Sequence, residues 1–288
     1  MEKVPHIVST EWLAERLDDP QLRLVDATTY LKNSESGEVE LWSGKETYEK
    51  GHIRGAVFAD ILNDLSDPDA DFRFTLPSRE RFVSKMEELG IGDENTYVVV
   101  YDQGYATVGE STIASDWASR LAWQLKYEGF DNVAVLEGGM AKWLDENRPV
   151  TTEKSSYPQV TFSGERNEDL FVTKEDVKNA LDDDDVIIIN SLSEESFKQG
   201  RIPGSCNVPF GDHADEDTKQ LYSDEVIREK FEKVGALDPN KKVITYCGGG
   251  IAATWNALLL NKLGQKNVAV YDGSMAEWTA DKSLPLEK

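Results

Sequence analysis

Cys247 has the side chain with the most evident chemistry in this sequence. It closes a short apolar run, VITYC, that predicts a strand, and it opens a glycine-rich segment, CGGGIAA, that leads into a helix-like run. Backbone N–H groups of such a turn point inward and the dipole of the following helix adds positive potential, so the position favours a sulfur anion. Because the thiolate is the nucleophilic form of cysteine, we interpret Cys247 as catalytic rather than as a buried core residue.

The residues that follow Cys247 limit the substrates that its thiol is expected to act on. Three consecutive glycines carry an entropic cost, but they allow the backbone to approach a ligand closely. A thiol phosphatase or arsenate reductase needs an arginine six residues after its cysteine to bind the oxyanion, and position 253 is alanine. Phosphate monoesters are therefore not expected as substrates.

The composition indicates two α/β domains with an acidic surface. A length of 288 residues suits two domains, and 39% hydrophobic residues supply two cores. The formal charge of −23 is spread along the chain, which argues against binding to nucleic acid or anionic membranes. No segment has the apolar length of a membrane span, and the amino terminus lacks the pattern of a secretory signal, so we expect a cytoplasmic location.

Cysteine and histidine usage argues against disulfides and metals. Two cysteines, Cys206 and Cys247, are too few for a secreted disulfide framework, which indicates a reducing compartment. The three histidines lack the spacing of metal ligands. We therefore expect no metal and no cofactor.

The chain repeats itself. GHIRGAVF at 51–58 matches GRIPGSCNVPF at 200–210, and NVAVLEGGMAKW at 132–143 matches NVAVYDGSMAEW at 267–278. Between these anchors, VVVYD aligns with VITYC, so Asp102 holds the position of Cys247 in the first copy. One copy therefore has no nucleophile.

Both copies follow the same order of elements. An early helix begins after Ser9 or Thr173, which are suitable N-caps, and short apolar strands then alternate with helices. This pattern predicts an α/β fold with two domains, each a parallel β-sheet flanked by helices on both faces. Ligands of such sheets bind beyond the carboxyl ends of the strands, where Cys247 falls.

The predicted domain organisation places a silent domain at 1–148, a linker at 149–169 and a catalytic domain at 170–288. The linker is polar, rich in serine, threonine and charge, and has no sustained periodicity. An extended strap that packs across both domains is the alternative for the same segment.

The tandem organisation together with the GHIRGA, GRIPGS, CGGGIAA, GGMAKW and DGSMAEW segments resembles the two-domain rhodanese-type sulfurtransferases over essentially the whole chain. The resemblance implies that Cys247 takes a sulfane sulfur from a small donor as a persulfide and passes it to a thiophilic acceptor such as cyanide. It further implies a cradle of backbone N–H groups from Gly248, Gly249, Gly250, Ile251, Ala252 and Ala253. The alternative is a sulfur carrier or regulatory module that delivers sulfur to a protein partner.

The residues expected to recognise the donor depart from the family pattern. Neither the cationic loop residues of thiosulfate enzymes nor the serine of mercaptopyruvate enzymes is present, although thiosulfate is the donor we favour. The arginine that family members often carry after a second-domain strand is absent, since this chain reads Asn190, Ser191, Leu192. Arg201 and His52, at matching positions in the two copies, are candidate substrate-binding residues; the alternatives are a surface cation and a structural hydrogen bond.

A longer loop distinguishes the first copy. The interval from Asp102 to Gly129 is ten residues longer than the interval from Cys247 to Gly264. We expect Tyr105 or its neighbours to help wall the active site, with a locally packed surface loop as the alternative. Cys206 is expected to be a buried residue rather than a resolving thiol.

Overall fold

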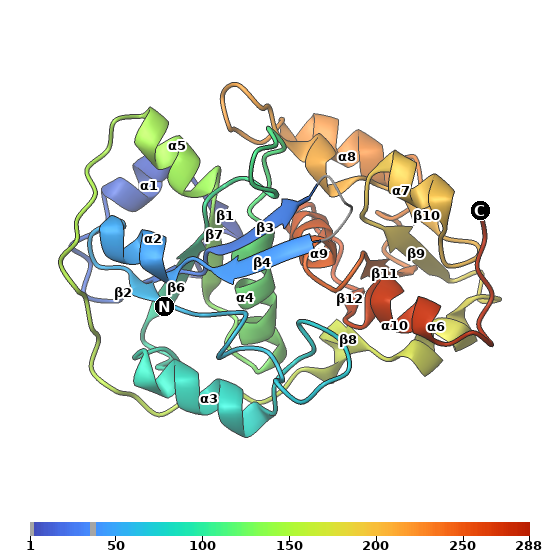
Figure 1. The fold of residues 1–288 in the computed structure, drawn as a ribbon, viewed down its shortest axis with the longest axis horizontal. Helices are drawn as coiled ribbons and strands as arrows, with labels where there is room; N and C mark the ends of the chain where they lie inside the picture. Colours follow the sequence, from blue (N-terminus) through green and yellow to red (C-terminus); the bar gives the residue numbers. More distant parts are fainter. Residues whose placement is uncertain (1–2, 35–38) are drawn as a thin grey trace.

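The computed structural model describes residues 3–34 and 39–288 and contains two α/β domains that lie side by side (Figure 1). In the first domain the elements are β1 (Ile7–Val8), α1 (Thr10–Ala14), β2 (Leu22–Asp26), β3 (Thr29–Asn33), β4 (Val39–Ser43), α2 (Lys45–Lys50), β5 (Val57–Phe58), α3 (Arg79–Glu88), β6 (Tyr97–Tyr101), α4 (Asp116–Tyr127), β7 (Val133–Leu136) and α5 (Gly139–Asp145).

The second domain repeats this order without the hairpin. Its elements are the 3-10 helix η1 (Glu168–Leu170), β8 (Phe171–Val172), α6 (Lys174–Ala180), β9 (Val186–Asn190), α7 (Glu194–Gln199), β10 (Cys206–Asn207), the 3-10 helix η2 (Phe210–His213), α8 (Asp224–Glu232), β11 (Lys242–Tyr246), α9 (Ala252–Lys262), β12 (Val268–Tyr271) and α10 (Ser274–Ala280). None of the helices in the described part of the chain has the length and apolar character that a membrane span requires.

Each domain is built on a five-stranded parallel sheet, which confirms the predicted fold class. The strand orders are β1-β7-β6-β2-β5 and β10-β9-β11-β12-β8, so β6 and β11 take the central place in their sheets. Alternate residues of β6 face opposite sides: Val98 and Val100 pack with α3 and α4, whereas Val99 packs with α1, α2 and α5. Helices therefore cover both faces of the sheet.

Specific contacts recur in the two copies. The N–H of Ile53 donates to the Tyr101 hydroxyl at 3.2 Å, and the N–H of Ile202 donates to the Tyr246 hydroxyl at 3.1 Å. The predicted N-caps also form: the Ser9 side chain accepts from the third residue beyond it, and Thr173 makes a full capping box. The sequence repeat is thus a structural repeat.

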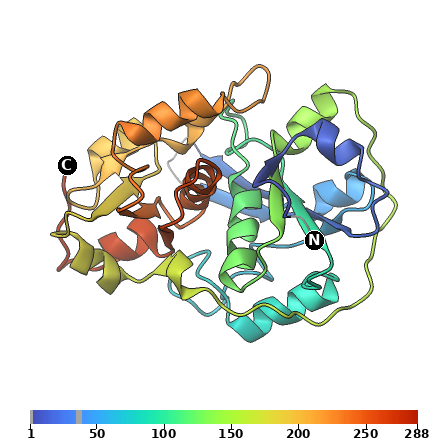
Figure 2. The same ribbon diagram turned by 180° about the vertical axis from the view of Figure 1, so that it is seen from behind.

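One apolar core joins the two domains. Helices α4 and α9, which follow the central strands of the two sheets, pack against each other and bury residues from both domains in a single cluster (Figure 2). At this contact the Ser119 and Thr254 hydroxyls lie 3.0 Å apart. The carboxyl edge of β11 therefore faces the first domain.

The segment between the domains runs in an extended course around the outer side of the first domain (Figure 1). Thr151 forms a bridge with His52, and the Tyr157 hydroxyl donates to the Gly55 carbonyl at 2.7 Å. Phe162 is buried in the core, where its ring meets Phe82 edge-on. This segment is fastened to the first domain over most of its length.

A β-hairpin that the sequence reading did not predict adds to the first domain. Strands β3 and β4 pair antiparallel, with Tyr30 opposite Trp42 and their rings stacked at 5.3 Å. The hairpin stands apart from the parallel sheet and lies over its carboxyl edge, and Leu31 and Asn33 reach the cavity beside Cys247.

Candidate active site

Cys247 directly follows the central strand β11, and hydrogen bonds hold its backbone in place. The residue is 2% exposed. Its N–H donates to the Ser274 hydroxyl at 3.0 Å, and its carbonyl accepts the N–H of Met275 at the same distance. Because Ser274 and Met275 begin α10, the loop after the neighbouring strand β12 fixes the backbone of Cys247.

The loop after Cys247 presents a set of backbone donors. Among the hydrogen bonds of the described residues, none is donated by the N–H groups of residues 248–253. Helix α9 begins at Ala252, its N-cap is Ile251, and no side chain caps it. The amino terminus of this eleven-residue helix can therefore bind an anion on the sulfur, through both its N–H groups and its dipole.

Gly250 is required at its position for two reasons. Its φ of +81° lies in the left-handed region that L side chains rarely adopt. A Cβ there would also lie 2.6 Å from the carbonyl oxygen of Asp272. The close approach of the loop to the end of β12 thus depends on this glycine.

Arg120 of the first domain holds the catalytic loop from behind. Its guanidinium Nη1 donates to the Gly250 carbonyl at 3.1 Å and pairs with Asp272 at 2.5 Å, while Nη2 donates to the Phe74 carbonyl. Arg120 is fully buried. The second oxygen of Asp272 accepts the N–H of Leu76 at 3.0 Å, so one ion pair ties together four segments from both domains.

A cavity of about 510 Å³ opens over the thiol. The second domain supplies the catalytic loop, the start of α7 and the η2 region, and the first domain supplies β3, the residues before α4 and Phe74. Phe74 has a φ of +66°, and its ring meets Trp117 edge-on at 5.3 Å. The first domain therefore forms part of the wall of the candidate site.

Acidic side chains dominate the charges of this cavity. Four carboxylates line it, and no lysine, arginine or histidine does so among the described residues; the acids are Glu110, Asp116, Asp212 and Glu216. Burial raises the pKa of Asp116 well above its ordinary value, and the neighbouring Asp102 adds to this rise. Among the described residues, the lining thus offers an anion the backbone N–H groups of the loop after Cys247 but no cationic side chain.

The predicted cradle residues divide into two groups. Gly248, Gly249, Ile251 and Ala252 line the cavity beside Cys247. Gly250 and Ala253 lie behind them: the Gly250 carbonyl bonds to Arg120, and the Ala253 carbonyl accepts the Thr245 hydroxyl at 3.0 Å. The loop thus has an inner face toward the cavity and an outer face that anchors it.

Arg201 and His52 lie outside the cavity, so the structure does not support their assignment as substrate-binding residues. The Arg201 guanidinium pairs with Glu287 and lies 4.7 Å from the Phe197 ring centroid. His52 is fully buried, and its ring nitrogens lie 2.7 and 3.0 Å from the carbonyls of Tyr48 and Glu153. Both residues fasten the chain at equivalent turns, because each also pairs through its backbone with the segment that follows its own domain.

The longer first-domain loop does reach the active-site cavity, although Tyr105 does not. Four of its residues line the cavity, namely Ala106, Thr107, Glu110 and Thr112. Tyr105 instead faces a separate cavity in the first domain. The Ser111 hydroxyl donates to Glu216 of the second domain at 2.5 Å, so the loop bridges the two domains at the rim of the site.

The Asp102 side chain lies in the first domain at the position that corresponds to the Cys247 sulfur in the second domain. One carboxylate oxygen accepts the N–H of Gly104 at 2.8 Å, and the other accepts the N–H of Ala118, in the first turn of α4, at 2.9 Å. Burial raises the pKa of Asp102 to about 7, against the opposing effect of these N–H bonds. A carboxylate thus occupies the donors of the first-domain loop.

Cys206 is partly buried in β10, and its sulfur donates to the Ile188 carbonyl at 3.4 Å. Burial raises the pKa of this thiol to about 11, which disfavours the nucleophilic thiolate. It does not line the cavity around Cys247.

Sequence reasoning missed Arg120, Phe74 and Asp272, which lie far from Cys247 in sequence or carry no recognisable motif. One signal was available for Arg120, since a lone arginine in the apolar run DWASRLAW of a buried helix requires a buried partner. Nothing in the sequence identified Asp272 as that partner.

Comparison with known proteins agrees with this geometry. The model of the rhodanese-like domain matches residues 9–146 and again residues 173–281. The chain is 31% identical over 291 residues to the 3-mercaptopyruvate sulfurtransferase of Escherichia coli, covering 97% of both proteins. It is 32% identical over 288 residues to the thiosulfate sulfurtransferase of Rattus norvegicus, covering 94% of this chain and 91% of that protein.

The fold has a close counterpart among solved structures. The crystal structure of SseA from Escherichia coli, described as a 3-mercaptopyruvate sulfotransferase with the rhodanese fold, superposes with a TM-score of 0.78 at 29% identity, covering 94% of this chain and 99% of that one. With both domains matched and relatives aligned over nearly their whole length, the chain belongs to the two-domain rhodanese-type sulfurtransferases.

Proposed function

We propose that this protein moves sulfane sulfur from a small donor to a thiophilic acceptor such as cyanide, through a persulfide on Cys247. The observation that carries the proposal is a buried thiol at the floor of a cavity, beside backbone N–H groups that have no partner among the described residues. The equivalent N–H groups of the first domain bind the Asp102 carboxylate, which supports an anionic sulfur as the natural occupant of the second set.

The proposed cycle has two steps. The Cys247 thiolate attacks the outer sulfur of the donor, an S–S bond forms on the enzyme, and the donor's own bond to that sulfur breaks; thiosulfate releases sulfite, and mercaptopyruvate releases the enolate of pyruvate, which then takes a proton. Cyanide next attacks the outer sulfur of the persulfide, a C–S bond forms, and the thiolate leaves with the electron pair of the broken S–S bond. Neither step requires a side chain that acts as an acid or base at the sulfur.

The charges of the cavity bear on the choice of donor. Thiosulfate, the donor favoured from the sequence, carries two negative charges at neutral pH, whereas mercaptopyruvate carries one. No lysine, arginine or histidine lines the cavity in the described part of the chain, whereas the exposed carboxylates of Glu110, Asp212 and Glu216 do. Because each further negative charge close to a carboxylate is disfavoured, the lining supports mercaptopyruvate as the better donor of the two.

Steady-state kinetics with each donor and cyanide, combined with mass spectrometry of the protein after donor treatment, tests the proposal. We expect the mass of one sulfur atom to be added to wild type and to C206S, and neither labelling nor turnover in C247S. We expect the kcat/KM for mercaptopyruvate to exceed that for thiosulfate by about fivefold or more, since one additional charge near carboxylates costs roughly 1 kcal/mol or more.

The results of these measurements distinguish an enzyme from a sulfur carrier. Labelling of Cys247 without turnover of either donor would favour the sulfur-carrier reading, in which a protein partner receives the sulfur. Full activity in C247S, or labelling that stays on Cys206, contradicts both the enzyme and the carrier.

A further inference from the structure

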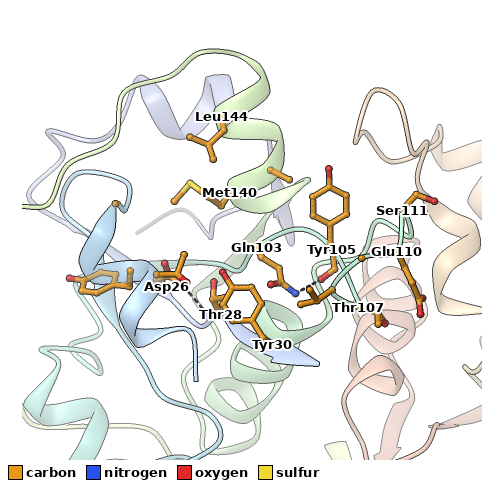
Figure 3. Close-up of a pocket in the computed structure, with 16 residues that line it drawn as sticks. Asp26, Thr28, Tyr30, Gln103, Tyr105, Thr107, Glu110, Ser111, Met140 and Leu144 are labelled. Carbon is orange, nitrogen blue, oxygen red and sulfur yellow. Dashed lines mark hydrogen bonds between the residues drawn. The ribbon is translucent and has the colours of Figure 1, made fainter. Parts of the chain in front are cut away.

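The first domain contains a cavity of about 660 Å³ that the proposed reaction does not use (Figure 3). It lies at the carboxyl edge of the first parallel sheet, because Asp26 ends β2 and Gln103 follows the central strand β6. This edge is where α/β sheets bind ligands, and the volume is within the range of small-molecule sites, about 300–1,000 Å³.

The walls of this cavity are aromatic and apolar. Tyr30, Tyr48 and Tyr105 come from three different segments, and Met140 and Leu144 of α5 lie across the cavity from Asp26, Thr28 and Tyr30 (Figure 3). Two of the tyrosines are fixed by neighbours: Tyr48 stacks on His52 at 4.0 Å, and Tyr30 stacks on Trp42. A ligand would meet a largely rigid aromatic surface.

The charges that line the cavity are negative. Asp26 and Glu110 are the ionisable acids of the lining, and no lysine, arginine or histidine belongs to it among the described residues. Asp26 is 3% exposed, and its Oδ1 accepts the N–H of Thr28 at 2.9 Å. Lys219 approaches Tyr105 at 6.0 Å but is not part of the lining, and its ammonium pairs with Asp145.

We propose that this cavity is a second ligand site, and that its ligand is a small organic cation with an apolar body, of the arylammonium or alkylammonium class. A buried carboxylate attracts a positive charge, and the faces of tyrosine rings stabilise a cation within about 6 Å of the ring centroid. The apolar body of such a ligand would pack on Met140 and Leu144. A neutral or anionic molecule of the same size lacks the charge that Asp26 and Glu110 recognise.

The site is separate from Cys247, yet it adjoins the catalytic cavity. Thr107 and Glu110 line both cavities, so the longer first-domain loop forms the wall between them. The ligand therefore does not need the thiol, and its binding is measurable whether or not the protein transfers sulfur.

Three probes of similar size and different charge test the proposal: benzylammonium, benzyl alcohol and benzoate. Isothermal titration calorimetry is carried out on wild type and on C247S. We expect benzylammonium to bind at least about tenfold more tightly than benzyl alcohol in both proteins, and benzoate to bind most weakly.

Variants identify which acidic cavity holds the cation, since the cavity around Cys247 is acidic as well. Leu144 is 50% exposed and lines only the first-domain cavity, so L144K adds a cation at little cost in folding, and L144Q is its neutral control. Asp212 is exposed and lines only the Cys247 cavity, so D212K is the matched control there. D26N removes the charge of the buried carboxylate.

We expect L144K and D26N to weaken benzylammonium binding about tenfold or more, and L144Q and D212K to leave it within about twofold of wild type. The proposal is overturned if benzylammonium binds no better than benzyl alcohol. It is equally overturned if D212K abolishes binding of the cation while L144K does not.

Discussion

At the scale of single residues, Cys247 and Asp102 stand at equivalent places at the ends of the two central strands, and their different side chains support the proposal that only the second domain transfers sulfur. Asp102 saturates N–H groups of its loop and of the start of α4 with its own carboxylate. The N–H groups after Cys247 have no partner within the described chain. The same local fold thus holds a carboxyl group in one domain and, in our proposal, leaves room for a transferable sulfur in the other.

The pKa of Asp102 predicts a pH-dependent contribution to stability. Burial raises this pKa from an ordinary value near 4 to about 7, so between these values the native state binds a proton that the unfolded chain releases. The stabilising contribution of Asp102 is therefore complete at low pH and is lost as the pH rises through 7. The free energy of unfolding of wild type, minus that of D102N, should fall by at most roughly 4 kcal/mol from pH 4 to pH 8.

Urea unfolding at several pH values measures this difference. Because D102N has no group to titrate at this position, its own pH dependence supplies the baseline from all other residues. A difference that stays constant from pH 4 to pH 8 would contradict the raised pKa.

Gly250 supports a second prediction at this scale. G250A forces a side chain into a positive φ and toward the Asp272 carbonyl, so we expect a loss of about 1–3 kcal/mol in unfolding free energy and slower sulfur transfer. G248A is the control for folding, since a Cβ at Gly248 meets no atom within 4 Å. Equal stability of the two variants would show that the strain is relieved elsewhere.

At the scale of elements, the segment between the domains behaves as part of the first domain. The Tyr157 hydroxyl both donates to the Gly55 carbonyl and accepts the N–H of Leu24 at 3.1 Å. Phe162 fills a place in the core, and its own N–H donates to Glu87 at 2.9 Å. The segment is polar in sequence because its hydrogen bonds run to the domain rather than within itself.

Removal of one hydroxyl tests this arrangement. Y157F leaves the Leu24 N–H and the Gly55 carbonyl without their partner, so thermal or urea unfolding should show a loss of about 1–3 kcal/mol. Y222F, at an exposed tyrosine, should change stability by less than about 0.5 kcal/mol. If the two variants are equally stable, the segment is only loosely attached.

At the scale of the whole molecule, the two domains form one structural unit around Cys247. The apolar core is continuous across α4 and α9, and Arg120 extends from the first domain to the carbonyl of Gly250. The geometry of the loop after Cys247 is therefore set partly by the first domain. This gives a physical reason for the presence of a domain that has no nucleophile.

Loss of the Arg120 side chain should affect both folding and sulfur transfer. R120M leaves Asp272 buried without its partner, for which we expect a loss of about 3–5 kcal/mol in unfolding free energy. R120K keeps the charge but cannot reach Gly250, Asp272 and Phe74 together, so kcat should fall more than stability does. R54M breaks an exposed pair with Asp18 and should leave stability close to that of wild type.

The double variant R120M/D272N distinguishes the contribution of the Arg120–Asp272 ion pair from that of the packing of the Arg120 side chain. If Arg120 acts mainly through its buried ion pair, the double variant should be no less stable than R120M alone, as a double-mutant cycle would reveal. Unchanged sulfur transfer in R120K would contradict the positioning role.

Local sequence patterns were sufficient to predict much of the fold of this protein and the position of its thiol. The apolar strand before Cys247, the glycines after it, the N-caps at Ser9 and Thr173 and the repeated segments all act between neighbours in sequence, and they predicted two parallel sheets with a thiol at the carboxyl edge of one of them. The hairpin β3–β4 was not predicted because its stability comes from packing over the sheet edge, and its sequence carries no strong local signal.

Only the tertiary structure decided what surrounds the thiol. Arg120 and Asp272 are 152 residues apart, and Phe74 meets Gly249 from the other domain, so no spacing in the sequence relates them. Arg201 likewise pairs with Glu287, 86 residues further along the chain, and one ring nitrogen of His52 meets the carbonyl of Glu153, 101 residues further along. The sequence by itself determined which thiol is the candidate nucleophile, because the strand, the glycine turn and the helix start that mark it are neighbours along the chain. The tertiary structure determined the charges and the walls around that thiol, because electrostatics and packing act through space.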